Sequence, residues 1–129
     1  MGFPKVKYQQ VTFSVTALNA IVPIDFETDK LYNTCTGINI VLSDEGAKFS
    51  KINLDFDSQE VFPEFFEVLR LMFRDQAPFG YDYHGLKEPA AGCKVKGSYK
   101  DAAGAAGYPY SVTISLRLEN IESTDAGKV

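Results

Sequence analysis

Apolar and polar residues alternate along much of this chain, most regularly in "SVTISLRLE", residues 111–119. Val112, Ile114, Leu116 and Leu118 fall on one side of this segment, and the residues between them are Ser, Thr, Arg or Glu. A period of two is typical of a β-strand with one buried side and one side facing solvent. A slip of one residue would expose the whole apolar set, so the pattern also specifies the register of the strand.

The same pattern predicts further strands along the chain. They are "KVKYQQVTFSV" (5–15), "AIVPIDF" (20–26), "GINIVLS" (37–43), "KINLDFD" (51–57) and "KVKGSY" (94–99). Pro23 interrupts the second of them, and proline is found in strands at sheet edges or bulges. Segments rich in Gly, Asp, Ser and Pro separate the strands and indicate turns. Strands at this spacing predict an all-β domain, an antiparallel sandwich or barrel.

The densest apolar stretch, "VFPEFFEVLRLMFRD" (61–75), allows two interpretations. A helix beginning at Pro63 would separate apolar from charged residues, which is a good amphipathic pattern. However, Phe62 at its cap position satisfies no backbone amide, and the following proline favours extended geometry there. The alternative makes 62–65 a turn and 66–73 a strand. We favour the turn and strand, and keep one short helix near 63–74 as the alternative.

Length and composition fit a single domain. The chain has 129 residues, of which 45% are hydrophobic and 23% charged. We expect residues 1–122 to form one β-sandwich domain and residues 123–129 to form a polar C-terminal tail. With 13 basic and 17 acidic residues, the net charge of -4 argues against a nucleic-acid-binding protein, which needs a basic surface.

Nothing in the sequence indicates export or membrane insertion. The first ten residues, "MGFPKVKYQQ", lack the apolar core of a secretory signal, and no run approaches 18 apolar residues. We therefore expect a soluble chain made in the cytoplasm. In that compartment the two cysteines, Cys35 and Cys93, are expected to be reduced, partly buried thiols, with a disulfide between them as the alternative.

The acidic segment "DFDSQE" (55–60) suggests a calcium site, because calcium binds several oxygen ligands. Asp55 and Asp57 share a strand face, and Glu60 follows closely. The EF-hand pattern fails, since Glu60 stands where glycine is required and Phe66 where the last glutamate is required. We expect a solvated strand face leading into a turn, and therefore no metal and no cofactor.

The longest loop signal is "QAPFGYDYHGLKEPAAG" (76–92), and loops of this length are often functional. Tyrosines here could stack on a sugar ring, with hydrogen bonds from their acidic and histidine neighbours. The favoured alternative is that the aromatic residues pack on the sandwich or contact a neighbouring subunit. The candidate interface or ligand residues are Phe79, Tyr81, Asp82, Tyr83 and His84.

No signature of catalysis accompanies this loop. His84 is the only histidine, so any acid–base pair that depends on histidine would have to be built around it. No serine or cysteine nucleophile motif and no phosphate-binding glycine motif is present. We expect no catalytic residues and no enzyme activity.

Residues 31–69 carry a series of motifs: an aromatic residue, a Thr-Gly strand opening, a turn, a polar–apolar strand, a Glu-x-Phe-Pro turn and a final Phe-Glu-Val. These parts are Tyr32, Thr36–Gly37, Asp44–Gly46, Asn53–Asp57, Glu60–Pro63 and Phe66–Val68. In this pattern the segment resembles small β-sandwich virion structural proteins of bacterial viruses. The similarity covers about a third of the chain.

The resemblance implies a jelly roll or related Greek-key sandwich without catalytic residues. It implies a role as a capsid vertex, decoration or spike-base component in the virion, with other copies of the chain and other virion proteins as partners. The alternative is a carbohydrate- or ligand-binding module that uses the loop at 76–92. A glycan is a partner only in that alternative, and neither function involves nucleic acid or membrane insertion.

Overall fold

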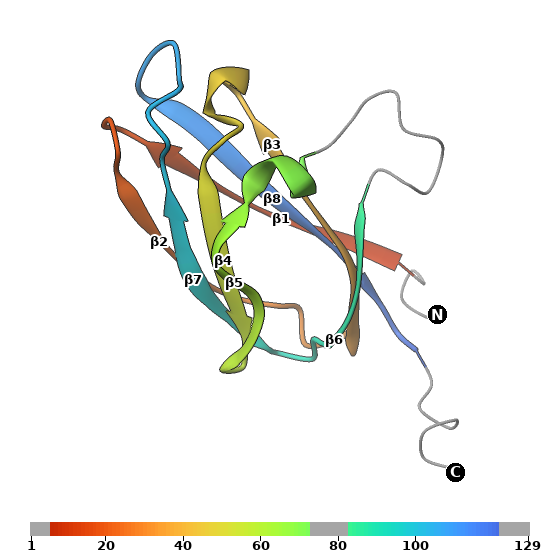
Figure 1. Cartoon of the computed structure of the whole chain (residues 1–129). Coiled ribbons are helices and arrows are strands. Elements are labelled where there is room, and N and C mark those ends of the chain that lie inside the picture. Colours follow the sequence, from red (N-terminus) through yellow and green to blue (C-terminus); the bar gives the residue numbers. More distant parts are fainter. Residues whose placement is uncertain (1–5, 73–82, 122–129) are drawn as a thin grey trace.

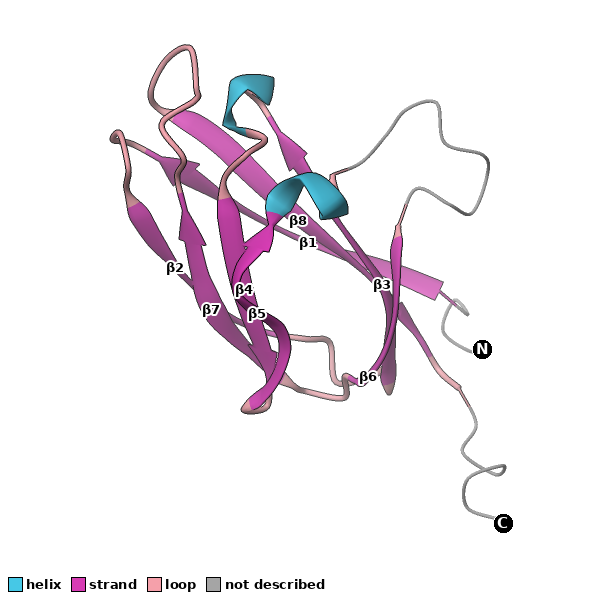
Figure 2. Cartoon of the chain, viewed as in Figure 1, coloured by secondary structure: helices cyan, strands magenta, loops and turns pink. Residues whose placement is uncertain are grey.

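The computed structural model describes residues 6–72 and 83–121, which form an antiparallel β-sandwich (Figure 1). Strands dominate the described part of the chain, and the only helical segments there are two single 3₁₀ turns (Figure 2). The all-β prediction is confirmed. The elements are β1 (Val6–Val15), β2 (Ile21–Glu27), β3 (Thr34–Leu42), η1 (Glu45–Ala47), β4 (Lys51–Phe56), β5 (Gln59–Glu67), η2 (Val68–Leu71), β6 (His84–Pro89), β7 (Lys94–Lys100) and β8 (Tyr110–Glu119).

The strand order is that of a jelly roll. One sheet has the order β1-β8-β3-β6 and the other β2-β7-β4-β5. Four antiparallel pairs, β1 with β8, β2 with β7, β3 with β6 and β4 with β5, form a long double hairpin. This hairpin rolls up because β8 also pairs with β3, and β7 also pairs with β4. The result is two Greek keys in two facing sheets.

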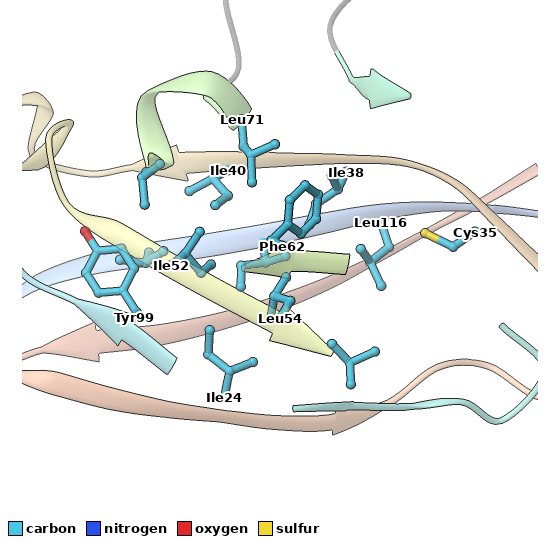
Figure 3. Packing of buried hydrophobic residues seen from close by; sticks show 14 of the residues in the cluster. Ile24, Cys35, Ile38, Ile40, Ile52, Leu54, Phe62, Leu71, Tyr99 and Leu116 are labelled. Carbon is cyan, nitrogen blue, oxygen red and sulfur yellow. The ribbon is translucent and has the colours of Figure 1, made fainter. Parts of the chain in front are cut away.

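The core lies between the two sheets (Figure 3). Val112, Ile114, Leu116 and Leu118 of β8 are all fully buried, which confirms the predicted inward face of this strand. On the opposite face of the same strand Ser115 is also buried, with only 3% of its surface exposed. Another part of the chain therefore covers a portion of the outer face of β8, which the sequence pattern predicts to be exposed to solvent.

The stretch at 61–75 differs from both interpretations. Residues 62–65 belong to β5, and the turn lies earlier, at Asp57 and Ser58, whose φ angles of 51° and 71° are those of a two-residue hairpin turn. Phe62 pairs with Leu54 and Phe66 with Ile52, so three residues of β5 oppose one residue of β4. This bulge, with Phe65 at φ 69°, allows both rings of the pair to face inward.

After β5 the expected strand over 66–73 is also wrong. The strand ends at Glu67, and a single 3₁₀ turn, η2, follows. Val68 and Leu71 are buried there while Leu69 and Arg70 are exposed, which is a spacing of three. The short helix considered near 63–74 is thus reduced to these four residues.

Residues 84–89, expected to be loop, form β6 and pair with β3. Pro23 lies in β2, the edge of its sheet, as predicted. Cys35 and Cys93 are free and buried, in agreement with the expected pair of thiols. The described part of the chain contains no helix that is long and apolar enough to cross a membrane.

Candidate functional site

Two of the five candidate residues of the predicted aromatic loop, Tyr83 and His84, belong to the described structure. Phe79, Tyr81 and Asp82 lie outside the described residues. Tyr83 and His84 are neighbours in sequence, but their side chains contact opposite faces of the sheet that contains β6. The two described residues are therefore divided between the outer surface of the sandwich and the space between its two sheets.

Tyr83 packs on the outer face of the β1-β8-β3-β6 sheet. Its hydroxyl forms a 2.7 Å hydrogen bond with Ser115 of β8. Its ring centroid lies 5.6 Å from that of Tyr8 on β1. A Cβ atom at Gly37 of β3 would lie only 3.0 Å from the Cβ of Tyr83, so glycine makes room for this contact. The predicted packing of loop aromatics on the sandwich thus holds for Tyr83, and it explains why Ser115 is buried.

His84 lies at the mouth of the sandwich between the edge strands β5 and β6. Its ring centroid is 5.9 Å from that of Phe62 and 6.5 Å from that of Phe66. His84, Leu86 and Glu88 alternate along β6 and share its inward side, since His84 pairs with the buried Ile38 of β3. Polar residues that point inward from an edge strand oppose its pairing with another strand, so they help to keep β6 separate from β5.

These residues line an open hollow of about 740 Å³. The apolar part of its lining comes from Val61, Phe62 and Phe66 of β5 and Leu86 of β6, and the polar part comes from Arg70, His84, Lys87 and Glu88. Ligand sites have this composition, an apolar surface with a few polar groups that orient the ligand. The hollow can hold a small amphipathic molecule or a side chain of another protein.

The charges at the hollow are mixed. Arg70 on η2 forms a 2.8 Å ion pair with Glu67, and both side chains are exposed. Burial raises the pKa of the nearby Cys35 thiol to about 11, and the negative charge of Glu88 is a smaller cause in the same direction. The hollow therefore offers apolar contact and hydrogen bonding, and the neighbouring Cys35 is not an activated thiol.

Polar contacts close the opposite mouth of the sandwich, between β1 and β2. The ammonium of Lys7 forms an ion pair with Asp29. The side-chain amide of Gln9 donates a 2.9 Å hydrogen bond to the carbonyl of Glu27 and accepts one from the backbone of Asp29. The two mouths thus differ, since polar contacts bridge the β1–β2 side and the hollow lies at the β5–β6 side.

Asp101 is a buried carboxylate that the sequence did not predict, and it holds together the connections at one end of the sandwich. Asp101, with 2% of its surface exposed, accepts 2.6 Å hydrogen bonds from the hydroxyls of Tyr108 and Tyr110. It also accepts hydrogen bonds of 2.9 and 3.0 Å from the backbone amides of Asn19 and Ala103. Burial raises the pKa of Asp101, but these hydrogen bonds lower it by more, so it lies below 3.8.

Two further segments at this end of the sandwich are linked by hydrogen bonds to the β7–β8 connection, directly or through Ser50. Ser50 accepts a hydrogen bond from the amide of Ala102 at 3.1 Å, and its carbonyl accepts one from Val68 of η2 at 3.0 Å. Asp44 accepts hydrogen bonds from the amides of Ala106 and Gly107. We name these four segments, 16–20, 43–50, 68–71 and 101–109, the loop end.

The acidic segment 55–60 contains the turn between β4 and β5. Asp57 forms the β4–β5 hairpin with Ser58, and its carboxylate accepts a 3.0 Å hydrogen bond from the amide of Lys94. No group of three or more His, Cys, Asp or Glu side chains is arranged for metal binding in residues 6–72 and 83–121. The local role of Asp57 is therefore to join the hairpin to β7.

Comparison with known proteins adds no relative. No model of a protein family matches the chain, and neither a curated protein nor a solved structure is significantly similar to it.

Proposed function

We propose that this chain is a non-enzymatic structural subunit of a bacterial virus particle, which acts by binding copies of itself and other particle proteins. The strand order β1-β8-β3-β6 and β2-β7-β4-β5 is the observation that carries the proposal. Eight-stranded jelly rolls of this kind are a recurrent architecture of viral capsid domains, and also of lectin domains and cupins. The virion-like sequence pattern at 31–69 spans β3, β4 and β5, so it coincides with part of this architecture.

The loop end supports a role in assembly. Large apolar side chains are exposed on three of its four segments: Leu18, Phe49 and Leu69 have 60%, 60% and 37% of their surface exposed. The hydrogen bonds around Asp101 and Ser50 hold these segments together, so their apolar groups are presented on a fixed framework. Exposed apolar groups on an ordered surface are typical of contact with other proteins.

A complementation experiment tests the proposal. A virus that encodes this chain is deprived of it, and the chain is supplied from a plasmid as wild type, as L18S/F49S or as L31S. Leu31 is the matched control, an exposed leucine in the connection between β2 and β3, away from the loop end. We expect wild type and L31S in purified particles and a loss of at least about tenfold for L18S/F49S, because apolar anchors dominate interface energy.

Each outcome is decisive when circular dichroism shows that all three proteins are folded. Absence of the wild-type chain from particles contradicts the proposed function. Equal incorporation of all three proteins would reject the loop end as the contact surface.

The second candidate function is a carbohydrate- or ligand-binding module. The hollow beside His84, Phe62 and Phe66 favours it, because its volume of about 740 Å³ lies within the range of known ligand pockets. A glycan array with the wild-type protein and with F66A tests this function. Binding that F66A abolishes, in a protein absent from particles, would establish the module in place of the structural subunit.

A further inference from the structure

We propose that two copies of this chain pair through the free edges of their β1 strands, so that the two β1-β8-β3-β6 sheets become one continuous sheet. The inference rests on the proposed function, since it names a surface for self-association. It comes from a comparison of the four edge strands, β1 and β6 in one sheet and β2 and β5 in the other. A free edge presents unpaired backbone donors and acceptors, and proteins usually obstruct it.

Three of the four edges are obstructed by their own sequence. β2 has Pro23 at its middle, with Asp25 and Glu27 following. β5 contains Pro63, two shifts of register against β4 and the positive φ of Phe65. β6 has only six residues, ends at Pro89 and carries a lysine and a glutamate. Proline, bulges, short length and charge are the devices that prevent pairing at an edge.

β1 has none of these devices. It is ten residues long, and its pairing with β8 runs from Val6 to Val15 without a shift. Its outward side chains, Val6, Tyr8, Gln10, Thr12 and Ser14, carry no charge. Within the described residues, β8 is its only strand partner. Long, regular and uncharged edges of this kind are the ones that pair with another chain.

The inward side of β1 also favours a second copy. Lys7 is the only charged residue of the strand, and Asp29 of the same chain neutralises it. Val11 and Phe13 are only partly buried, whereas Val15 at the end of the strand is fully buried. A second β1 beside the first would cover Val11 and Phe13, which lie opposite Gln9 and Lys7 of the second copy in the register that follows.

Symmetry and the pleat restrict the register. Two identical antiparallel strands pair about a two-fold axis, and directly opposite residues must share a face. Val15 leads into the turn towards β2, so the longest pairing that leaves this turn intact joins residues 6–14 of both copies. Gln10 then faces Gln10 of the second copy, and Tyr8 faces Thr12, an aromatic and a β-branched residue that pair well across strands. Such a dimer closes on itself and uses both free edges.

Charge exchange at Gln10 tests the pairing. Gln10 is exposed. We expect Q10K alone and Q10E alone to weaken self-association at least about tenfold in sedimentation experiments, because each places like charges directly opposite. A mixture of the two should restore the dimer as a heterodimer in native mass spectrometry. D25K, which changes the charge of the β2 edge, is the matched control and should associate like wild type.

A cysteine variant tests the register. Q10C should form a disulfide-linked dimer under mild oxidation, because the two thiols meet at the two-fold axis, while D25C should not. Cys35 and Cys93 are buried and should not interfere. A monomeric wild type, unchanged association of Q10K, failure of the mixture to recover, or equal cross-linking of Q10C and D25C would overturn the inference. These results concern only pairing at the β1 edge. The proposed function is tested separately, by whether the wild-type chain is incorporated into particles.

Discussion

Removal of the Asp101 carboxylate should destabilise the whole domain, although the alternating sequence pattern does not identify this residue as part of the core. D101A deletes the acceptor of four hydrogen bonds, one from Asn19 in the β1–β2 turn and three from Ala103, Tyr108 and Tyr110 in the β7–β8 connection and at the start of β8. A hydrogen bond to a charged group contributes roughly 1.5–3 kcal/mol. The amides of Asn19 and Ala103 lie in exposed turns and regain water, but the hydroxyl of the buried Tyr110 does not.

One full charge-assisted hydrogen bond and partial loss of the others amount to about 3 kcal/mol. Domains of this size have a free energy of unfolding of about 5–15 kcal/mol, so the loss is a large fraction of the total. The melting temperature should fall by roughly 10 °C. Thermal unfolding followed by circular dichroism at pH 7 measures the effect, with D25N at an exposed aspartate as the control. A D101A protein that melts within about 2 °C of wild type would refute the argument.

The pH dependence has a definite sign. The folded-state pKa of Asp101 lies below its ordinary value of 3.8, so the ionised carboxylate stabilises the fold above that pH. This contribution is lost as the pH falls from about 4 through the folded-state pKa. The difference in stability between wild type and D101N should therefore be constant from pH 5 to 7 and narrow below about pH 4. A difference that widens on acidification would contradict the assigned role.

Three further predictions concern the core and the thiols. L116D places a charge where a fully buried leucine lies, costs several kcal/mol and should leave the chain unfolded by circular dichroism; a melting temperature near that of wild type would reject the inward face of β8. G97A puts a Cβ atom 1.9 Å from a backbone oxygen of β4 and should lower the melting temperature strongly, whereas G85A meets no atom within 4 Å and should leave it nearly unchanged. Burial raises the pKa of Cys35 to about 11 and that of Cys93 to about 12, so both thiols should resist Ellman's reagent at pH 8 in the native protein and react after denaturation. Rapid reaction of either thiol in the native protein would mean that it is not buried as described.

Alternation in the sequence predicts the regular strands well, because a strand with one buried face has apolar side chains at every second position. β8 and β4 are the best examples, with Leu116 and Leu54 on the inward faces. β5 was harder, since its bulge places three residues opposite one and destroys the period of two. β6 was missed because "HGLKEP" has weak strand propensity, and it forms a strand through pairing with β3.

The candidate site, too, could be predicted only in part from the sequence. His84 was identified from its residue type, but its contacts with Phe62 and Phe66 depend on the rolled hairpin that brings β5 opposite β6. Those contacts join residues from separate strands, and no local pattern records them. Asp101 was missed for a related reason. Its segment "DAAGAAG" indicates only a turn, while its donors come from three places along the chain.

The copy number of this chain in purified particles tests the central claim most directly. Quantitative mass spectrometry with isotope-labelled peptides of the chain and of the major capsid protein would measure their molar ratio. A structural subunit that occupies symmetric positions should give a fixed ratio, the same in independent preparations and unchanged by high-salt washing. A ratio that falls towards zero with each purification step would contradict the account.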